Sequence, residues 1–290
     1  MPIFSITHLT DYRYQRTVTF GEHRMMLRPR DDEDQKVIQA DLAINPNPKE
    51  IAWDRDQFNN HFAIARFFEH SDQLRFVSNI RLDHVARPFS AGDIEGYARD
   101  HPFQYKPEEL STLEQFIFPL PLDRELRPWS DQFFRGDGTA DTFDLLSGMR
   151  QTIFRTFRHV NRHEEGIQEP VESIALRSGS CRDLAVLMMA ALRSRGLAAR
   201  FVSGYRRLSE DEQEDQVLNG GNTHAWIQAY VPGPGWVDFD PSAGTTGNEN
   251  LVRVATVAQP HEAIPLQGTW YGDLSDHLAM TVAVKVNLAD

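Results

Sequence analysis

The chain has 290 residues, a formal net charge of −12 and a sequence pI of about 5.4. Hydrophobic residues make up 40% of it and charged residues 25%, which is ordinary for a soluble globular protein. A surface this acidic repels phosphate groups, so we expect neither nucleic acid nor an anionic membrane as a partner.

Cysteine content and apolar runs indicate where the protein works. The only cysteine is Cys181, so the chain can form neither an internal disulfide nor a cysteine-rich zinc site. Residues 1–8 lack the basic region and the apolar run of a secretory signal. The longest apolar stretch, Ala185 to Leu192, is too short to span a bilayer. These features predict a reduced, soluble protein of the cytoplasm.

Residues 1–88 are predicted to form an N-terminal β module. Apolar residues alternate with mostly polar ones from Ile38 to Ile44 and share one parity from Leu74 to Leu82, as in half-buried strands. Turn residues such as Asn59-Asn60 separate these runs. Several short strands without a long helical pattern favour a sandwich-like module. Prolines then break residues 89–140 into short helical pieces that connect this module to the rest.

Two helices are predicted in the second domain, residues 89–290. The first begins at residues 141–142 and carries an apolar stripe at helical spacing. The second opens at Ser180, has Asp183 three residues on as in a capping box, and ends before Gly196.

Strand patterns occupy most of the remaining chain. We expect strands at residues 199–205, 224–231, 236–240 and 277–289. A Pro-Gly-Pro-Gly turn joins the second strand to the third and indicates a hairpin. An acidic loop, residues 208–222, precedes that hairpin, and its Gly220-Gly221 pair could serve as a hinge. The elements together predict an α+β fold.

Cys181 is the first residue of the capped helix, and this position makes it a candidate nucleophile. The start of a helix has free N–H groups and partial positive charge, which lower the pKa of a thiol. The backbone N–H of Cys181 can also hold a developing oxyanion. Gly179, two residues earlier, has no Cβ and would let a substrate backbone approach. An inert buried thiol is the alternative that applies to most lone cysteines.

The predicted hairpin supplies two partners for this thiol. His224 begins its first strand and could act as the base, and Asp240 ends its second strand. A hairpin of this length places these two ends side by side, so Asp240 can orient the imidazole. Asp238 has the same parity but lies two residues further from the strand end, which favours a surface or supporting role for it.

Several motifs together resemble the core of the bacterial transglutaminase-like superfamily over residues 140–245. They are Ser178–Ala185, Gly196–Tyr205, His224–Trp226, Pro232–Trp236 and Phe239–Ser242. Ile6-Thr7-His8, Tyr12-Arg13-Tyr14, Leu27–Arg30 and Asn59-Asn60 are similar to the β region that precedes this core in one bacterial branch. The likeness departs at Ser180, where a hydrophobic residue is common, and at Ser242, where threonine is usual.

The resemblance implies a papain-like fold, in which the nucleophile helix packs on an antiparallel sheet that carries histidine and aspartate. It implies acyl transfer from an amide through a thioester, with Cys181, His224 and Asp240 as the triad. The expected substrate is a peptide or protein amide. Hydrolysis is the favoured outcome, transfer to an amine is the alternative, and a non-catalytic binding module on the same fold is a third possibility.

Other candidate residues have weaker support. Tyr205 and Trp226 could line the substrate cleft, although each could equally belong to the core. His159 and His163 have a metal-compatible spacing but no third ligand, so we predict no metal site. No glycine-rich phosphate loop is present, and no cofactor is expected.

Overall fold

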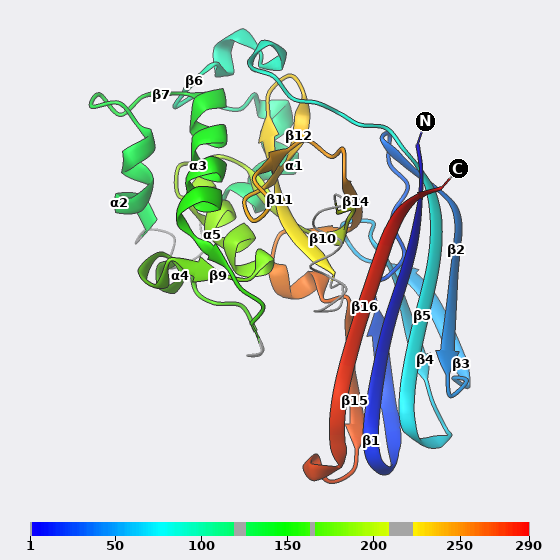
Figure 1. The fold of residues 1–290 in the computed structure, drawn as a ribbon. Helices are drawn as coiled ribbons and strands as arrows, with labels where there is room; N and C mark the ends of the chain where they lie inside the picture. Colours follow the sequence, from blue (N-terminus) through cyan, green and yellow to red (C-terminus); the bar gives the residue numbers. More distant parts are fainter. Residues whose placement is uncertain (1, 119–125, 163–165, 209–222, 290) are drawn as a thin grey trace.

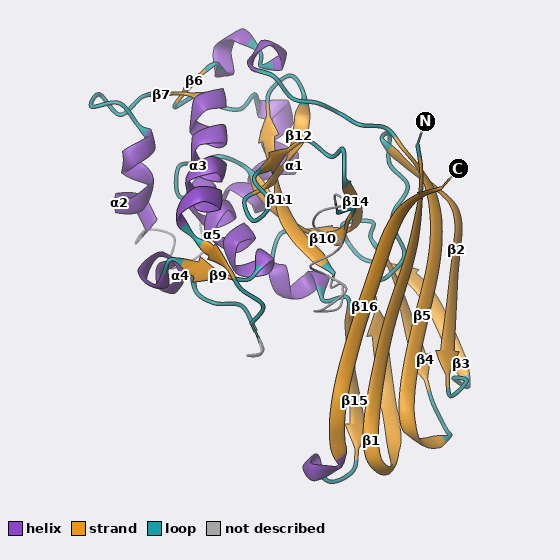
Figure 2. Cartoon of the chain, viewed as in Figure 1, coloured by secondary structure: helices purple, strands orange, loops and turns teal. Residues whose placement is uncertain are grey.

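The computed structural model describes residues 2–118, 126–162, 166–208 and 223–289. Its chain forms a long, curled sheet beside a compact helical part that surrounds a second sheet (Figure 1). Almost all helices lie in this second part, whereas the long sheet is made of strands (Figure 2). Within the described residues, no helix combines the length and the apolar character needed to cross a bilayer.

The long sheet is antiparallel, with the strand order β2-β5-β1-β4-β3. These strands are β1 (Ile3–Met25), β2 (Gln35–Asn45), β3 (Glu50–Arg55), β4 (His61–Arg66) and β5 (His70–His84). Irregularities between Arg13 and Val18 and between Phe20 and His23 interrupt the pairing of β1, and such bulges increase the twist of a strand. The prediction of a strand-rich N-terminal region is confirmed, but the strands form one curled sheet that covers its own apolar core.

Two C-terminal strands complete this sheet. They are β15 (Leu266–Tyr271) and β16 (His277–Ala289), and both pair with β1. The predicted strand at 277–289 is therefore present, but its partner belongs to the N-terminal module and not to the second domain with which the sequence groups it. The pairing of Ile3 with Ala289 brings the two chain ends together, as Figure 1 shows.

The connecting segment is mostly irregular and packs on the second part. It contains α1 (Pro107–Ile117) and α2 (Arg127–Ser130), together with β6 (Asp100–His101), which pairs with β7 (Ala140–Asp141). Each of the two helices has proline in its first turn, where the missing N–H costs nothing. Phe116 of α1 is buried and stacks edge-on against Trp236, so the segment is docked on the hairpin.

The second part holds a five-stranded antiparallel sheet with the order β13-β12-β11-β10-β14. Its strands are β10 (Ala199–Arg206), β11 (His224–Val231), β12 (Gly235–Asp240), β13 (Thr245–Thr246) and β14 (Leu251–Val257). The helices are α3 (Thr142–Thr156), α4 (Pro170–Leu176) and α5 (Cys181–Arg193), and short strands β8 (Arg158–His159) and β9 (Ser178–Gly179) pair in parallel. The predicted starts of both helices and the predicted hairpin are confirmed.

Helix α5 is the central element of the main core. All its residues from Asp183 to Arg193 are buried, and its apolar side chains pack on one face of β10 and β11. The mixed fold, with a helix packed on an antiparallel sheet, agrees with the predicted α+β class. This packing also fixes the start of α5 relative to the end of the hairpin, where the candidate site lies.

Buried polar contacts join the long sheet to the second part. The Tyr205 hydroxyl lies 3.0 Å from Nδ1 of His8 and donates to the carbonyl of Leu27 at 3.2 Å. Arg253 of β14 forms an ion pair with Asp34, just before β2. Because these groups are buried and paired across the contact, they favour one specific docking of the two parts.

Candidate active site

The start of α5 is held by a reciprocal capping box. The Ser180 Oγ accepts from the backbone N–H of Asp183 at 3.3 Å, and Oδ2 of Asp183 accepts from the backbone N–H of Ser180 at 2.8 Å. Asp183 is buried, and its carboxylate also pairs with Arg162 at 3.1 Å. The predicted cap is thus confirmed, and it holds Cys181 in the first helical turn, where backbone N–H groups lack helical partners.

Gly179 makes room for this cap. A Cβ on Gly179 would lie 2.9 Å from the Cβ of Asp183, which is closer than side chains tolerate. Its carbonyl accepts a hydrogen bond from the backbone N–H of Val160 at 3.0 Å. The glycine therefore accommodates the capping carboxylate and the β8–β9 pairing. The substrate contact expected of it stays a prediction.

The hairpin of β11 and β12 brings His224 and Asp240 together. The imidazole Nε2 donates to Oδ2 of Asp240 at 2.6 Å. The carboxylate is fully buried, and the His224 side chain is 14% exposed. The other carboxylate oxygen accepts from the hydroxyl of Ser242 at 2.7 Å and from the backbone N–H of Ala243 at 3.0 Å. Asp240 is thus fixed on both oxygens, and it fixes one side of the imidazole.

The thiol of Cys181 completes the group. Burial opposes its ionisation, but hydrogen bonds from His159 and His224 outweigh burial and lower its pKa to about 6. For His224, burial disfavours the charged form, but the charge and hydrogen bond of Asp240 and the hydrogen bond with Cys181 raise its pKa to about 10. Burial likewise opposes ionisation of Asp240, and the charge of His224 and its hydrogen bond lower that pKa to about 2. The three groups therefore favour a thiolate, an imidazolium and a carboxylate near neutral pH.

Comparison with known proteins agrees with this geometry. The family model of the bacterial transglutaminase-like N-terminal region matches residues 4–83, and that of the transglutaminase-like superfamily matches residues 135–241. The chain belongs to the transglutaminase-like superfamily. This is a family of thiol-dependent enzymes, and its core here has the expected arrangement of helix and antiparallel sheet.

Individual relatives extend the likeness over the whole chain. An uncharacterized protein of Mycobacterium tuberculosis is 25% identical over 306 residues, which span 98% of this chain and 92% of that protein. An uncharacterized Mycobacterium leprae protein is 32% identical over 106 residues, 37% of each chain. The crystal structure described as "a Putative Cysteine Protease from Cytophaga hutchinsonii" has a TM-score of 0.72 and 17% sequence identity, and covers 100% of this chain and 91% of that chain. That last likeness concerns the fold.

Tyr205 and Trp226, for which the sequence left a cleft position and a core position open, are both buried. Tyr205 is 1% exposed, and its hydroxyl contacts the long sheet, so it joins the two parts of the molecule. Trp226 is also fully buried; its ring stacks on His224 at a centroid distance of 5.9 Å. Both are interior residues in this structure, and Trp226 supports the imidazole from behind.

Asp238 is the carboxylate that holds Trp226 in place. It accepts from the indole N–H at 2.6 Å, from the amide of Gln228 at 3.1 Å and from Arg253 at 3.3 Å. It is 4% exposed, so the surface position that the sequence allowed for it is wrong. No hydrogen bond with His224 is present among its described contacts, and the predicted supporting role agrees with this geometry.

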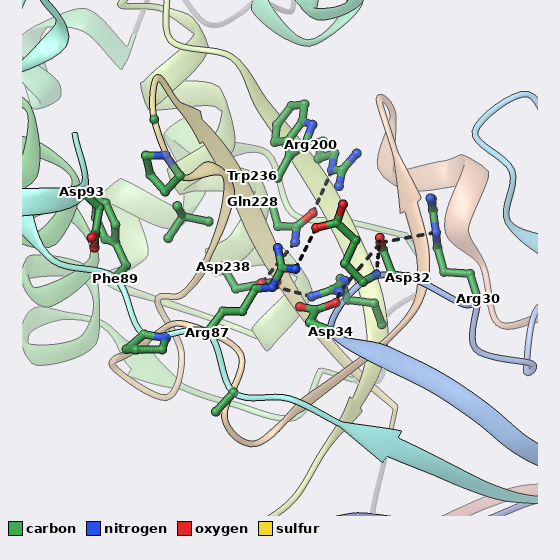
Figure 3. Close-up of a pocket in the computed structure, with 17 residues that line it drawn as sticks. Arg30, Asp32, Asp34, Arg87, Phe89, Asp93, Arg200, Gln228, Trp236 and Asp238 are labelled. Carbon is green, nitrogen blue, oxygen red and sulfur yellow. Dashed lines mark hydrogen bonds and ion pairs between the residues drawn. The ribbon is translucent and has the colours of Figure 1, made fainter. Parts of the chain in front are cut away.

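A cavity of about 800 Å³ lies beside Asp238, where residues 30–34 and 86–93 meet the hairpin (Figure 3). Arg200 and Gln228 face it, whereas their neighbours in the strands pack toward α5, because side chains alternate across a sheet. Neither Cys181 nor His224 lines it. Its wall therefore lies on the face of the sheet that points away from α5, and we do not assign the substrate to it because neither the thiol nor the imidazole lines it.

His159 and Ser242 are site residues whose roles the sequence did not reveal. The pairing of β8 with β9 places His159 opposite Gly179, two residues before Cys181, a contact between segments about 20 residues apart. The sequence marked His159 only as a possible metal ligand, because of its spacing from His163. His163 lies outside the described residues. Ser242 lies at a position where the resemblance makes threonine usual, and its hydroxyl donates to Asp240, as a threonine hydroxyl could also do. The loop predicted at 208–222 lies outside the described residues from 209 onward.

Proposed function

We propose that the protein is a cysteine-dependent amide hydrolase in which Cys181 is the nucleophile, His224 the acid and base, and Asp240 the orienting carboxylate. The observation that carries this proposal is the 2.6 Å hydrogen bond from His224 to the buried carboxylate of Asp240, beside a thiol whose pKa the same imidazole lowers. A thiol whose pKa falls to about 6 is ionised at neutral pH, and the thiolate is the reactive form.

The reaction would proceed in two balanced steps. The thiolate of Cys181 attacks the amide carbonyl carbon, and the C–N bond breaks as His224 gives its proton to the departing amine. A water molecule then attacks the thioester, its proton passes to His224, and the carboxylic acid and the thiolate are released. The backbone N–H of Cys181 stabilises the oxyanion in both steps, since it lies in the free first turn of α5.

The proposal also specifies which molecule takes the acyl group from the thioester. Water gives hydrolysis of a peptide or isopeptide bond, whereas an amine gives a new amide. We favour water because none of the described residues marks a second site for an amine at the thiol. Membership of the transglutaminase-like superfamily supports a peptide or protein amide as the substrate.

A mass-spectrometric screen tests this function. Wild type and Cys181→Ala would be incubated with mixed peptides and γ-glutamyl amides, with and without added amines. We expect an acyl adduct on Cys181 and release of free acid in the wild type alone. Product that carries the added amine would support transfer instead, and equal turnover by both proteins would exclude Cys181 as the nucleophile.

Variants of the other two residues separate their roles. His224→Ala should lose turnover severely, because neither the thiol nor the leaving amine would have its proton partner. Asp240→Ala should lose somewhat less, since it orients the imidazole without touching substrate. If folded Asp238→Ala lost more turnover than folded Asp240→Ala, the role of orienting the imidazole would belong to Asp238 and not to Asp240.

We also propose that the enzyme acts in the cytoplasm. What supports this is that the one cysteine of the chain is a free thiol, which a reducing compartment keeps unoxidised. Fractionation of cells that express the full chain, followed by immunodetection, would test this, and recovery in the extracytoplasmic fraction would contradict it.

A further inference from the structure

The cavity of about 800 Å³ beside Asp238 lies on the face of the five-stranded sheet that points away from α5 (Figure 3). Its other walls come from residues 30–34, just before β2, and from residues 86–93 of the connecting segment. It therefore lies where the long sheet, the connecting segment and the second part of the molecule meet. Small-molecule sites occur preferentially at such junctions, and about 300–1,000 Å³ is their usual volume.

A row of three polar side chains crosses the sheet in the wall of this cavity. Arg200 of β10 pairs with Gln228 of β11, which in turn pairs with Asp238 of β12. The side-chain amide of Gln228 accepts from Nε of Arg200 at 2.8 Å and donates to the carboxylate of Asp238 at 3.1 Å. Because both ends of the amide are engaged, the row holds the guanidinium of Arg200 in one orientation.

An aromatic ring supports the same guanidinium. Its central carbon, Cζ of Arg200, lies 4.1 Å from the centroid of the Trp236 ring, within the range of a cation–π contact. Figure 3 shows the two side chains next to each other, with Arg200 joined to Gln228. Among the described residues, no hydrogen bond or ion pair involves the two terminal nitrogens, Nη1 and Nη2. Since Arg200 is only partly buried and lines the cavity, these donors can be reached from it.

The other arginines that line the cavity each form an ion pair with a carboxylate. The pairs are Arg253 with Asp34, Arg253 with Asp238 at 3.3 Å, Arg87 with Glu33 at 2.7 Å, and Arg30 with Asp32 at 3.8 Å. The remaining carboxylate of the lining, Asp93, accepts hydrogen bonds from Ser90. Of the described residues that line the cavity, Arg200 is therefore the one cation without a carboxylate partner.

The surroundings of Arg200 make its unpaired charge costly. Burial and the nearby charges of Arg30 and Arg253 lower the pKa of Arg200 to about 9, while the charges of Asp238 and Asp32 act in the opposite direction. The guanidinium is still protonated at neutral pH, in a place that disfavours its charge. A bound anion would stabilise this charge, and a carboxylate matches the planar fork of a guanidinium with two parallel hydrogen bonds.

We propose that this cavity is a binding site for a small monocarboxylate, whose two oxygens accept hydrogen bonds from Nη1 and Nη2 of Arg200. One negative charge is favoured over two, because carboxylates outnumber arginines in the lining and would repel a dianion such as phosphate. Neither Cys181 nor His224 lines the cavity, so the site is separate from the triad and the inference does not depend on the proposed function.

Isothermal titration calorimetry on the full-length protein tests the site. The probes are benzoate and N-acetylglycylglycine, which carry the carboxylate on a ring and on a short peptide, and each is compared with its neutral amide. Inorganic phosphate is the dianion control. We expect at least one of the two carboxylates to bind, with its amide and phosphate weaker by about tenfold or more, since only the carboxylate forms the charge-assisted pair. The probe that binds shows which of the two frames the cavity accepts.

Substitutions at position 200 assign the binding to the guanidinium. Arg200→Gln removes the charge and the fork, and should weaken carboxylate binding by about ten- to a hundredfold. Arg200→Lys keeps the charge without the fork, so its affinity should lie between those of Arg200→Gln and the wild type. Arg81→Gln is the matched control, because Arg81 is an exposed arginine of β5 outside the cavity, and it should bind like the wild type. Cys181→Ala should also bind like the wild type.

The outcomes decide the proposal. The absence of binding by both carboxylates would overturn it, and so would equal binding of an amide or of phosphate, or wild-type affinity in Arg200→Gln. Loss of binding in Cys181→Ala would place the probe at the thiol and would also overturn it. Circular dichroism and a thermal melt would establish that each variant is folded. If Arg200→Gln does not fold, Arg200→Lys carries the test, and wild-type affinity in that variant would contradict the paired contact.

Discussion

Replacing Asp238 with alanine should destabilise the protein strongly while leaving the triad able to form. The carboxylate of Asp238 accepts hydrogen bonds from Trp226 at 2.6 Å, Gln228 at 3.1 Å and Arg253 at 3.3 Å. Alanine would leave the indole N–H and the amide without this acceptor in the interior. It would also remove one of the two nearest carboxylates from the buried Arg253.

The size of the effect follows from these lost contacts. Each buried polar group left without a partner costs about 1–3 kcal/mol. Removing one member of a buried ion pair costs about 3–5 kcal/mol when the remaining charge is left uncompensated, and this is an upper bound for Arg253 because its ion pair with Asp34 remains. Since the losses share one carboxylate, they do not simply add, and we expect the free energy of unfolding to fall by about 3–5 kcal/mol.

Urea denaturation followed by tryptophan fluorescence would measure this change. Asp54→Ala is the matched control, since Asp54 is an exposed aspartate of β3 and should change the free energy of unfolding by less than about 0.5 kcal/mol. Below the unfolding transition, Asp238→Ala should keep the wild-type pH dependence of Cys181 alkylation, because Asp240 holds the imidazole. A free energy of unfolding within about 0.5 kcal/mol of wild type would refute this account of Asp238.

Three further predictions concern the active site, the docking of the two parts and the smaller sheet. Turnover should rise as the pH increases past about 6, because the catalytic thiol loses its proton there, and it should fall past about 10, because the catalytic imidazole then loses the proton it must donate. A kcat/KM profile that still rises at pH 11 would contradict this. Tyr205→Phe should lower the free energy of unfolding, measured in urea, by about 1–2 kcal/mol, because Nδ1 of the buried His8 ring loses the Tyr205 hydroxyl as its hydrogen-bond partner. An unchanged free energy of unfolding would show that this contact does not help to hold the two parts together. Gly204→Ala should lower the free energy of unfolding by about 2 kcal/mol or more in the same assay, because the added Cβ would lie 2.1 Å from the carbonyl oxygen of Val252. The control Gly136→Ala, whose added Cβ would have no atom within 4 Å, should leave the free energy of unfolding nearly unchanged.

Local sequence rules predicted the parts of the site that local chemistry builds. A capping box places Ser180 and Asp183 within one helical turn, so it shows in the sequence and also fixes where Cys181 begins the helix. The Pro-Gly-Pro-Gly turn fixes the register of the hairpin, and with it the approach of His224 to Asp240. Both features depend on residues close in the chain.

Only the tertiary structure shows which element packs against each face of a strand. Alternation placed Tyr205 and Trp226 on particular faces, but an aromatic residue facing a cleft and one facing another element have the same pattern in the sequence.

Long-range pairing was equally invisible in the sequence. The strand at 277–289 was recognisable by its period, yet its partner β1 lies at the other end of the chain, and alternation carries no information about the partner. The pairing of β8 with β9, which places His159 opposite Gly179 and near the start of α5, is likewise not visible in the sequence.

The sequence by itself therefore determined a capped helix that begins with the nucleophile and a hairpin that carries its base and its carboxylate, because short-range backbone geometry specifies both. Only the packed structure decided that Asp238 supports the hairpin from the interior, that Tyr205 joins the two parts, and that β8 pairs with β9 just before the nucleophile. These contacts join residues distant in the chain, and they depend on which surfaces are buried together.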